Sequence, residues 1–312
     1  MGIRANAVWA VLGLPFSLLS VFYYIYVYCC KEKLMLKDKV VFITGASSGL
    51  GAACAEAFYT AGCRLVLSGR NVEKLNLLKV RMEKSKEGTG FHSPAIVTMD
   101  LEDLPSIKEK VKEVLAAFGH VDILINNAGK SYRGVALHTK LEVDKMLMDV
   151  NYFAHVEVTR AILPQMVERK TGQIVAIGSV QSRIAIPHRT SYAASKHAMQ
   201  AYFDVLRSEV AQYNIGVSVV NPYYIATNLS TNAVSADGSA YGKLDANTKA
   251  GLQPEYVASK VVSCVVNRTS ELTVAPPHID LAIALRAMSP WLFFKIMERR
   301  AKKEQREMNK DR

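Results

Sequence analysis

The stretch KVVFITGASSGLGAACAEAFYTAG, residues 39–62, decides the fold of this chain. Residues 39–44 are a short apolar run rich in β-branched side chains, which predicts a strand, and residues 49–62 have the periodicity of a helix. Between strand and helix the chain supplies three glycines, Gly45, Gly49 and Gly51. Backbone N–H groups and the helix dipole attract an anion at such a junction, and glycines let a pyrophosphate approach. We interpret the stretch as an anion-binding turn, with an ordinary tight turn as the alternative.

Strand and helix signals alternate after this stretch. Apolar strands are predicted at residues 64–69, 94–100, 121–129, 172–179 and 215–222, and helices at 72–86, 104–118 and 191–210. Such alternation predicts an α/β fold of the Rossmann type, with a doubly wound parallel sheet in a three-layer α/β/α arrangement. Ligands bind beyond the carboxyl ends of parallel strands, so residues at those ends should converge on one crevice. They are Gly45, Asp100, Asn126, Ser179 and Pro222.

The helix predicted at residues 191–210 carries a tyrosine and a lysine four residues apart, Tyr192 and Lys196. On a helix these positions are neighbours on one face. The spacing alone does not identify a site, because Tyr256 and Lys260 repeat it. A solvated helix surface is the ordinary explanation of such a pair.

Several motifs together resemble the short-chain dehydrogenases/reductases, over about residues 38–277. They are TGASSGLG at 44–51, NNAG at 126–129, Asn151, Ser179 and YAASK at 192–196. Ser179 precedes Tyr192 by 13 residues, as that family places them. No serine-ended strand precedes Tyr256, so we assign Tyr256 to a helix surface.

The resemblance implies a catalytic set of Asn151, Ser179, Tyr192 and Lys196. Tyr192 would be the acid/base; the pKa of a free tyrosine is about 10, and a nearby ammonium such as that of Lys196 lowers it. Lys196 would also hold the nicotinamide ribose. Ser179, with Tyr192, would contact the substrate oxygen, and Asn151 would hold a water that links Lys196 to solvent. Ser179 has no partner histidine and acid in an elbow motif, which argues against a serine hydrolase.

The predicted cofactor is a nicotinamide dinucleotide. NAD selection uses an acid after the second strand, whereas an arginine there suits a 2′-phosphate. The chain has Arg70 in LVLSGRN and no acid, so NADP(H) is favoured over NAD(H), with helix capping by Arg70 as the alternative. The implied cofactor residues are Gly45, Ser47, Ser48, Gly49, Leu50, Gly51, Arg70, Asp100, Leu101, Asn126, Ala128, Gly129, Tyr192, Lys196, Pro222, Ile225 and Thr227.

One residue departs from the family pattern. The family usually has Pro-Gly where this chain has Pro222 and Tyr223. Glycine adopts positive φ freely, while tyrosine is strained there. We therefore expect a reshaped nicotinamide end. The departure also supports an alternative function, a nucleotide-binding scaffold or sensor without turnover.

Residues 7–30, AVWAVLGLPFSLLSVFYYIYVYCC, carry no charge. About 20 apolar residues span a bilayer, and aromatic residues suit its interface. The segment lacks a small-residue cleavage site, so we predict an uncleaved single-pass anchor in the endoplasmic reticulum membrane. More lysines follow it than precede it, which favours a cytosolic catalytic domain, although Arg4 opposes this and a lumenal domain is the alternative.

We thus divide the chain into an anchor at 1–36, a catalytic domain at 37–277 and a basic, amphipathic segment at 278–312. The long stretch 227–253 lacks periodicity and matches the family's substrate loop. Residues 278–300, HIDLAIALRAMSPWLFFKIMERR, predict a C-terminal helix that packs on the domain or lies on a bilayer.

The net charge of +11 lies mostly at the two ends, which favours a membrane lipid surface over nucleic acid, with solubilising tails as the alternative. Five cysteines without metal-ligand spacing predict neither a disulfide scaffold nor a metal site. Two membrane contacts beside one site favour a lipophilic ketone or aldehyde as substrate, of sterol, retinoid or acyl-dihydroxyacetone-phosphate type. A homodimer is compatible with this interpretation.

Overall fold

A seven-stranded parallel sheet organises the domain, in the order β3-β2-β1-β4-β6-β7-β9. The computed structural model describes residues 19–21, 33–85, 91–243 and 245–310. The strands are β1 (Val40–Ile43), β2 (Arg64–Gly69), β3 (Ala95–Thr98), β4 (Ile123–Asn126), β6 (Gly172–Ile177), β7 (Ile215–Pro222) and β9 (Glu271–Val274). The strand order reverses between β1 and β4, so the doubly wound Rossmann-type sheet is confirmed.

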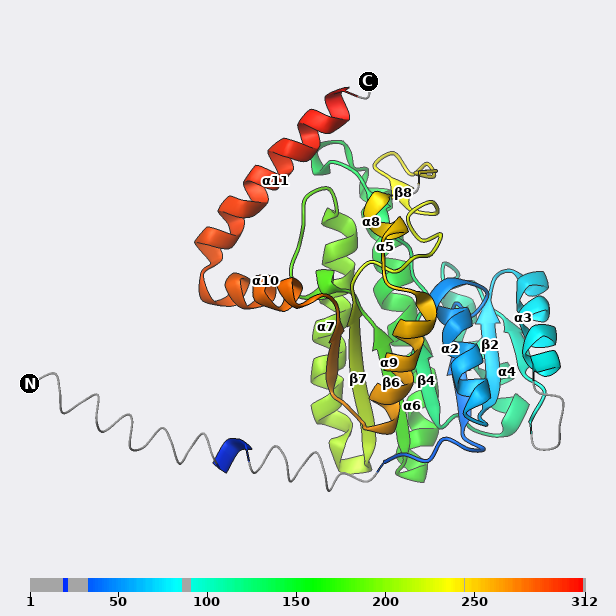
Figure 1. Ribbon diagram of the computed structural model, residues 1–312. Helices are drawn as coiled ribbons and strands as arrows, with labels where there is room; N and C mark the ends of the chain where they lie inside the picture. The colour runs from blue at the N-terminus through cyan, green and yellow to red at the C-terminus, as the bar shows by residue number, and fades with distance from the viewer. Residues whose placement is uncertain (1–18, 22–32, 86–90, 244, 311–312) are drawn as a thin grey trace, which may run out of the picture. The chain divides into compact units, whose positions relative to one another are not determined.

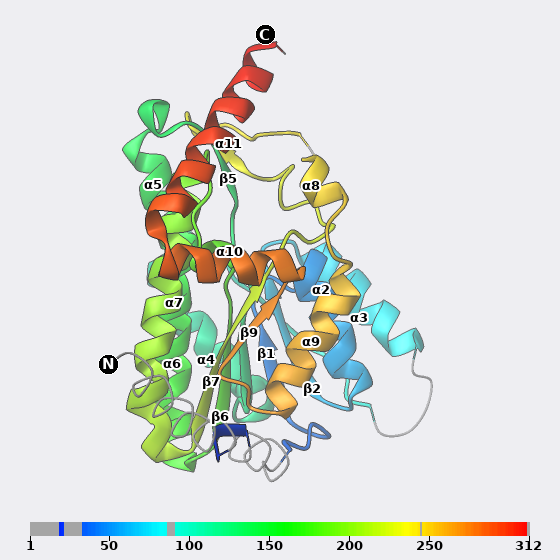
Figure 2. The ribbon, with the colours of Figure 1, turned by 60° about the vertical axis from the view of Figure 1, so that its left-hand side comes forward.

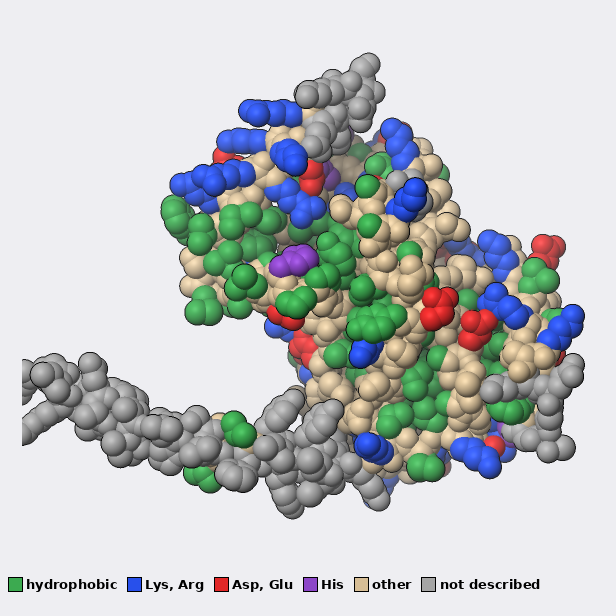
Figure 3. Space-filling view, in the orientation of Figure 1, with side chains coloured by type: hydrophobic (Ala, Val, Ile, Leu, Met, Phe, Trp, Pro, Cys, Tyr) green, Lys and Arg blue, Asp and Glu red, His purple; other side chains and the backbone are tan. Residues whose placement is uncertain are grey.

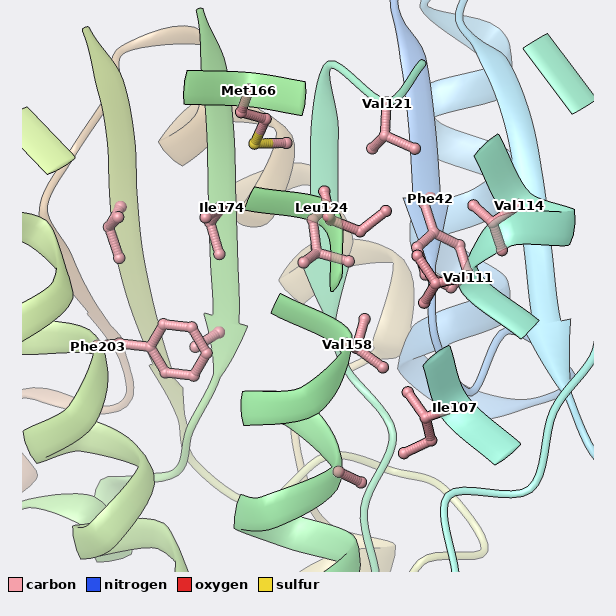
Figure 4. Close-up of a cluster of buried hydrophobic side chains, with 14 of the residues drawn as sticks. Phe42, Ile107, Val111, Val114, Val121, Leu124, Val158, Met166, Ile174 and Phe203 are labelled. Atoms are coloured by element: carbon pink, nitrogen blue, oxygen red, sulfur yellow. The ribbon is translucent and has the colours of Figure 1, made fainter. Parts of the chain in front are cut away.

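Helices cover both faces of this sheet (Figures 1 and 2). One face carries α4 (Ile107–Phe118), α6 (Ala154–Arg169) and α7 (Thr190–Val210); the other carries α2 (Gly49–Thr60), α3 (Val72–Ser85) and α9 (Pro254–Val266). In the core, side chains from the strands meet those of α4, α6 and α7 (Figure 4); they include Phe42, Leu124, Ile174, Val111, Val158 and Phe203. The apolar strands are therefore buried between two helical layers.

The remaining elements are short or lie near the C-terminus. They are β5 (Tyr132–Arg133), β8 (Val234–Ser235), α5 (Leu141–Met148), α8 (Ala246–Lys249), α10 (Pro277–Met288) and α11 (Pro290–Lys310), the 3-10 turns η1 (Leu104–Ser106), η2 (Ala136–His138), η4 (Val180–Ser182) and η5 (Ala211–Tyr213), and the π-helical turn η3 (Asp149–Phe153).

One feature differs from the sequence prediction. The C-terminal segment forms two helices instead of one, because Pro290 has no N–H group and its ring prevents α10 from continuing. In the predicted substrate loop, β8 pairs with β5, and the Leu252 N donates a hydrogen bond to the Tyr224 carbonyl at 2.8 Å. In Figure 1 this loop lies at the same end of the sheet as α11.

The predicted anchor at 7–30 lies outside the described residues, apart from 19–21. Within the described part of the chain, none of the helices combines the length and the apolar character that a membrane crossing needs. Met1–Leu34 and Met35–Arg312 are separate units, and the site lies in the second.

Candidate active site

The turn between β1 and α2 requires its glycines. Gly45 has a φ of +67°, and a Cβ added there would lie 2.8 Å from the Ala128 Cα. A Cβ at Gly51 would lie 2.2 Å from the Gly45 carbonyl oxygen. Ser48 precedes α2 but makes no capping hydrogen bond with its side chain. The first N–H groups of α2 therefore have no side-chain cap, which suits the pyrophosphate of a dinucleotide.

A cavity of about 930 Å³ extends from this turn to the loop at 227–253. Most of the predicted residues line it: Gly45, Ser47, Ser48, Gly49, Leu50, Gly51, Arg70, Asp100, Leu101, Ala128, Gly129, Ser179, Tyr192, Lys196, Pro222, Ile225 and Thr227. Asn126 and Asn151 do not. The residues at the carboxyl ends of the strands thus converge on one crevice, with Asn126 as the exception.

Asn126 is fully buried beneath the cavity. Its Nδ2 donates a hydrogen bond to the Thr159 Oγ1 at 2.9 Å, and its Oδ1 lies 3.2 Å from the His155 Nδ1. The His155 Nε2 lies 2.8 Å from the Ala128 carbonyl oxygen. Asn126 therefore does not line the cavity; it supports the strand end that carries Ala128, and its role at the ribose stays a prediction. The next residue, Asn127, lines the cavity, and only the Asn-Asn doublet in the sequence hinted at it.

Asn151 lies in the π-helical turn η3 and holds the backbone at Lys130. Its Oδ1 accepts from the Lys130 N at 2.8 Å, while its Nδ2 donates to the Lys130 carbonyl at 2.9 Å and to the Ser195 Oγ at 3.0 Å. Both amide hydrogens are therefore used. A water relay from Lys196 would have to use a carbonyl oxygen of Asn151, and this role stays a prediction.

Ser179, Tyr192 and Lys196 all line the cavity. Ser179 follows β6, while Tyr192 and Lys196 stand on the first turns of α7. Ser179 and Tyr192 are both buried, each with 8% of its surface exposed, and the Ser179 Oγ accepts from the Gln181 N at 3.1 Å. The Lys196 Nζ lies 6.0 Å from the centre of the Tyr192 ring and donates to the Ile177 carbonyl at 2.8 Å.

Burial controls the ionisation of both α7 groups. It raises the pKa of Tyr192, while the nearby Ser179 hydroxyl and the positive charge of Arg133 lower it. Burial also lowers the pKa of Lys196 to about 8. Burial thus acts against the lowering expected from a nearby ammonium, and the net shift of the Tyr192 pKa is upward. At neutral pH the phenol keeps its proton, as a proton donor requires.

Tyr256 provides an internal comparison. It lies on α9 with 49% of its surface exposed, and the Lys260 Nζ is 5.3 Å from its ring centre. Neither residue lines the cavity. The assignment of this pair to a helix surface is confirmed, so burial and a serine partner, not the spacing, distinguish Tyr192.

Tyr223 lines the cavity without backbone strain. It is absent from the residues with positive φ, and its N donates to the Val274 carbonyl at 2.9 Å, which continues the pairing of β7 with β9. Its ring contacts the rings of Tyr224 and His278 edge to face, at 4.9 and 6.2 Å between centres. The expected strain at Tyr223 is therefore wrong.

Arg70 lies at the opposite end of the cavity and is 59% exposed. It does not cap α3, because the Asn71 Oδ1 accepts from the Lys74 N at 2.8 Å and makes the cap. The Arg70 Nη1 is 2.6 Å from the Glu102 Oε1, and the Lys130 Nζ lies 2.8 Å from the same oxygen. Two cations thus share one carboxylate at this end.

Comparison with known proteins agrees with this geometry. A family model described as short chain dehydrogenase matches residues 39–238. Dehydrogenase/reductase SDR family member 7B of Xenopus tropicalis is 51% identical over 87% of this chain and 88% of that protein.

Two solved structures share the fold. A metagenomic short-chain oxidoreductase in complex with NADP is 29% identical, with a TM-score of 0.63 over 78% of this chain and 99% of that one. A Burkholderia phymatum short-chain dehydrogenase/reductase in complex with NAD is 22% identical, with a TM-score of 0.73 over 83% of this chain and 96% of that one. With its glycine turn, its buried Ser179–Tyr192–Lys196 set and these matches, the chain belongs to the short-chain dehydrogenase/reductase family.

Proposed function

We propose that this oxidoreductase reduces a lipophilic ketone or aldehyde to the alcohol with NADPH. The observation that carries the proposal is that one cavity joins the glycine turn to the buried Ser179–Tyr192–Lys196 set. The turn is shaped for a dinucleotide, and a bound nicotinamide cofactor supplies the hydride.

The protein's own groups then have distinct tasks. The Ser179 hydroxyl binds the substrate oxygen beside Tyr192, since both residues line the same cavity. Tyr192, kept protonated by burial, donates the proton to that oxygen. Lys196 is almost fully buried and lines the same cavity. Gly129 leaves room beside the ammonium, since a Cβ added to Gly129 would lie 3.7 Å from the Lys196 Nζ.

The preference for NADPH over NADH rests on Arg70. Because Asn71 caps α3, the Arg70 guanidinium is available at the cavity rim, and a 2′-phosphate could replace Glu102 as its partner. The metagenomic relative was solved with NADP, which is consistent with this proposal.

The lipophilic substrate and a membrane location are supported by α10 and α11. Hydrophobic side chains gather over these helices, with basic ones beside them (Figure 3). The exposed apolar residues are Leu281, Met288, Trp291, Leu292, Phe294 and Ile296. Arg286 lies 4.7 Å from the Phe294 ring and Lys295 lies 4.9 Å from the Trp291 ring. Aromatic faces edged by cations fit an anionic lipid surface, which we propose is that of the endoplasmic reticulum.

The alternative, a nucleotide-binding protein without turnover, depended on strain at Tyr223. The relaxed backbone there removes this support. The four residues of the predicted catalytic set are also present, and three of them meet in the cavity.

The test follows NADPH oxidation by the purified full-length protein with sterol, retinoid and acyl-dihydroxyacetone-phosphate ketones. Tyr192→Phe should lower turnover about 100-fold or more, because it removes the proton donor and little volume. Tyr256→Phe is the matched control and should change turnover less than about twofold. NADPH binding, measured by fluorescence, should persist in both variants. Full turnover by Tyr192→Phe would overturn the proposed mechanism.

A further inference from the structure

Beyond Tyr192, three charged side chains from distant parts of the chain meet beside the cavity. Arg133 lies on β5 and lines the cavity, Arg189 immediately precedes α7, and Asp245 immediately precedes α8 in the substrate loop. The pairing of β5 with β8 brings this loop over the site. The three side chains are only 8%, 13% and 15% exposed, respectively.

One carboxylate oxygen serves both arginines. The Arg133 Nε and Nη2 lie 2.6 and 2.5 Å from the Asp245 Oδ2, and the Arg189 Nη2 lies 3.4 Å from the same atom. A buried cation is normally paired with an anion. Here two buried cations share a single acid, so the cluster has an excess positive charge.

Other acids do not balance this excess among the described residues. Glu304 on α11 also acts on Arg189, but its Oε1 lies 2.7 Å from the Arg300 Nε, so it already has a cation partner. Burial and the neighbouring Arg133 lower the pKa of Arg189 to about 10, which leaves it charged at neutral pH.

Arg189 also has an unused donor. Its Nε is buried and has no hydrogen-bond partner, while its Nη1 donates to the His188 carbonyl at 2.9 Å. A guanidinium has five N–H donors in a planar fork that matches carboxylate and phosphate oxygens. Polar residues line the cavity at this end as well: Ser131, Ser230, Asn232 and Ser239.

We propose that Arg133 and Arg189 bind an anionic group, a phosphate or carboxylate, on a substrate whose carbonyl lies at Ser179 and Tyr192. This inference rests on the proposed reductase function and narrows its substrate class. Arg133 lines the same cavity as Ser179 and Tyr192, which places the anion site in the cavity that holds the reacting carbonyl. The site selects an amphiphilic ketone with an acidic head and disfavours neutral sterol and retinoid ketones, which would leave the buried positive charge unpaired.

The first arm of the test measures binding without NADPH, by calorimetry on the full-length protein in detergent. The probes are an acylglycerol phosphate, the matching free fatty acid and the neutral monoacylglycerol. The wild type should bind at least one anionic probe about tenfold more tightly than the neutral one, and the stronger of the two identifies phosphate or carboxylate as the preferred head.

Arg189→Gln should remove that preference and leave neutral binding within about twofold. Arg81→Gln is the matched control, since Arg81 is 65% exposed on α3 and pairs with Glu56 at 2.6 Å. If Arg189→Gln does not fold, Arg189→Lys keeps the charge but loses the fork, and should weaken only the anionic probes. Equal weakening of anionic and neutral probes would show that Arg189 merely supports the loop, and no preference in the wild type would also overturn the proposal.

The second arm measures turnover of acyl-dihydroxyacetone phosphate against the same ketone without its phosphate, and of a keto fatty acid against its methyl ester. An anionic member should have the higher kcat/KM, and Arg189→Gln should lower it about tenfold or more. Anion-selective binding without turnover of any ketone would refute the reductase function while supporting the anion site. Turnover of neutral ketones with no preference for anionic ones would support the reductase function and refute the anion site.

Discussion

Lys196 is a buried cation, and its ionisation links stability to pH. Its pKa is about 8 in the folded protein, against an ordinary value of 10.5. Between these values the folded state has released the proton while the unfolded chain keeps it, so the free energy of unfolding should rise with pH. The expected slope from this group is about 1.4 kcal/mol per pH unit.

Urea denaturation of the wild type and Lys196→Met between about pH 8 and about pH 10 measures this slope. The difference between the two free energies of unfolding should grow with pH in favour of the wild type. Tyr192 does not cancel this rise in the free energy of unfolding. Burial raises its pKa above its ordinary value of 10.0, so its ionisation affects stability only at higher pH than the range measured. Parallel curves for the two proteins would contradict the assignment of Lys196 as a buried, charged group.

In the proposed NADPH site, Glu102 competes with the 2′-phosphate for Arg70. It lies 2.6 Å from Arg70 and 2.8 Å from Lys130, so it neutralises part of the charge at this end of the cavity. Glu102→Gln should tighten NADPH binding about three- to tenfold and change NADH binding little. Arg70→Glu should weaken NADPH much more than NADH. Fluorescence titration with both cofactors checks this; equal changes for NADPH and NADH would mean that these charges do not contact the 2′-phosphate.

At the scale of elements, neighbouring residues of α11 face different surroundings. Phe293 is 2% exposed, whereas Phe294 is 53% exposed and Trp291 is 70% exposed. Phe293 therefore packs α11 onto the protein, while Trp291 and Phe294 are available to a lipid surface. Phe293→Ala should lower the free energy of unfolding by about 3 kcal/mol or more, and Phe294→Ala by much less.

The chain has two tryptophans, Trp9 and Trp291, so Trp9→Phe leaves Trp291 as a single reporter on α11. In vesicles containing anionic lipid, we expect brominated acyl chains to quench its emission. Phe294→Glu should reduce this quenching, because a carboxylate opposes entry into the bilayer. Phe153→Glu, at an exposed phenylalanine next to α6, should have no effect. Absence of quenching in the Trp9→Phe protein would show that α11 does not contact the lipid.

Local sequence patterns predicted the strands that are buried on all sides by neighbouring strands and helices. The bounds of β2 and β7 agree with the predicted ranges because both are centred on branched apolar residues and are buried at nearly every position. The edge strand β9 was not predicted, since its sequence ELTV is polar at two positions and mostly half-buried. The helix α6 has Pro164 in its interior, which argues against a helix until the surrounding packing is known.

The same distinction applies to the site. The glycine turn and the Ser179–Tyr192–Lys196 set follow from motifs with fixed spacing. The orientation of Asn126 depends on Thr159 and His155, and the backbone of Tyr223 depends on β9, so neither was predictable locally. Arg133 and Arg189 are separated from Asp245 by 112 and 56 residues, and only the folded chain brings them together.

At the scale of the whole molecule, the proposed membrane anchor leaves a cytosolic and a lumenal location for the domain, and these differ in the NADPH pool that the proposed reductase would use. Two glycosylation sequons, at Asn228 and Asn267, would be modified only in the lumen. Asn228 is exposed and lines the cavity, whereas the Asn267 Nδ2 donates to the Ser263 carbonyl at 2.8 Å. A glycan on Asn228 would therefore stand at the rim of the active site and hinder entry.

This geometry agrees with the excess of lysines at 31–39 over Arg4, which predicts a cytosolic domain. The full-length chain, expressed in mammalian cells, should show no mobility shift after glycosidase treatment, and protease should digest the domain in intact microsomes. Asn228→Gln should then leave the mobility unchanged. A glycosidase-sensitive shift that disappears in Asn228→Gln, with protection from protease, would place the domain in the lumen. The reductase would then draw on the lumenal NADPH pool, with a glycan beside the cavity through which its substrate enters.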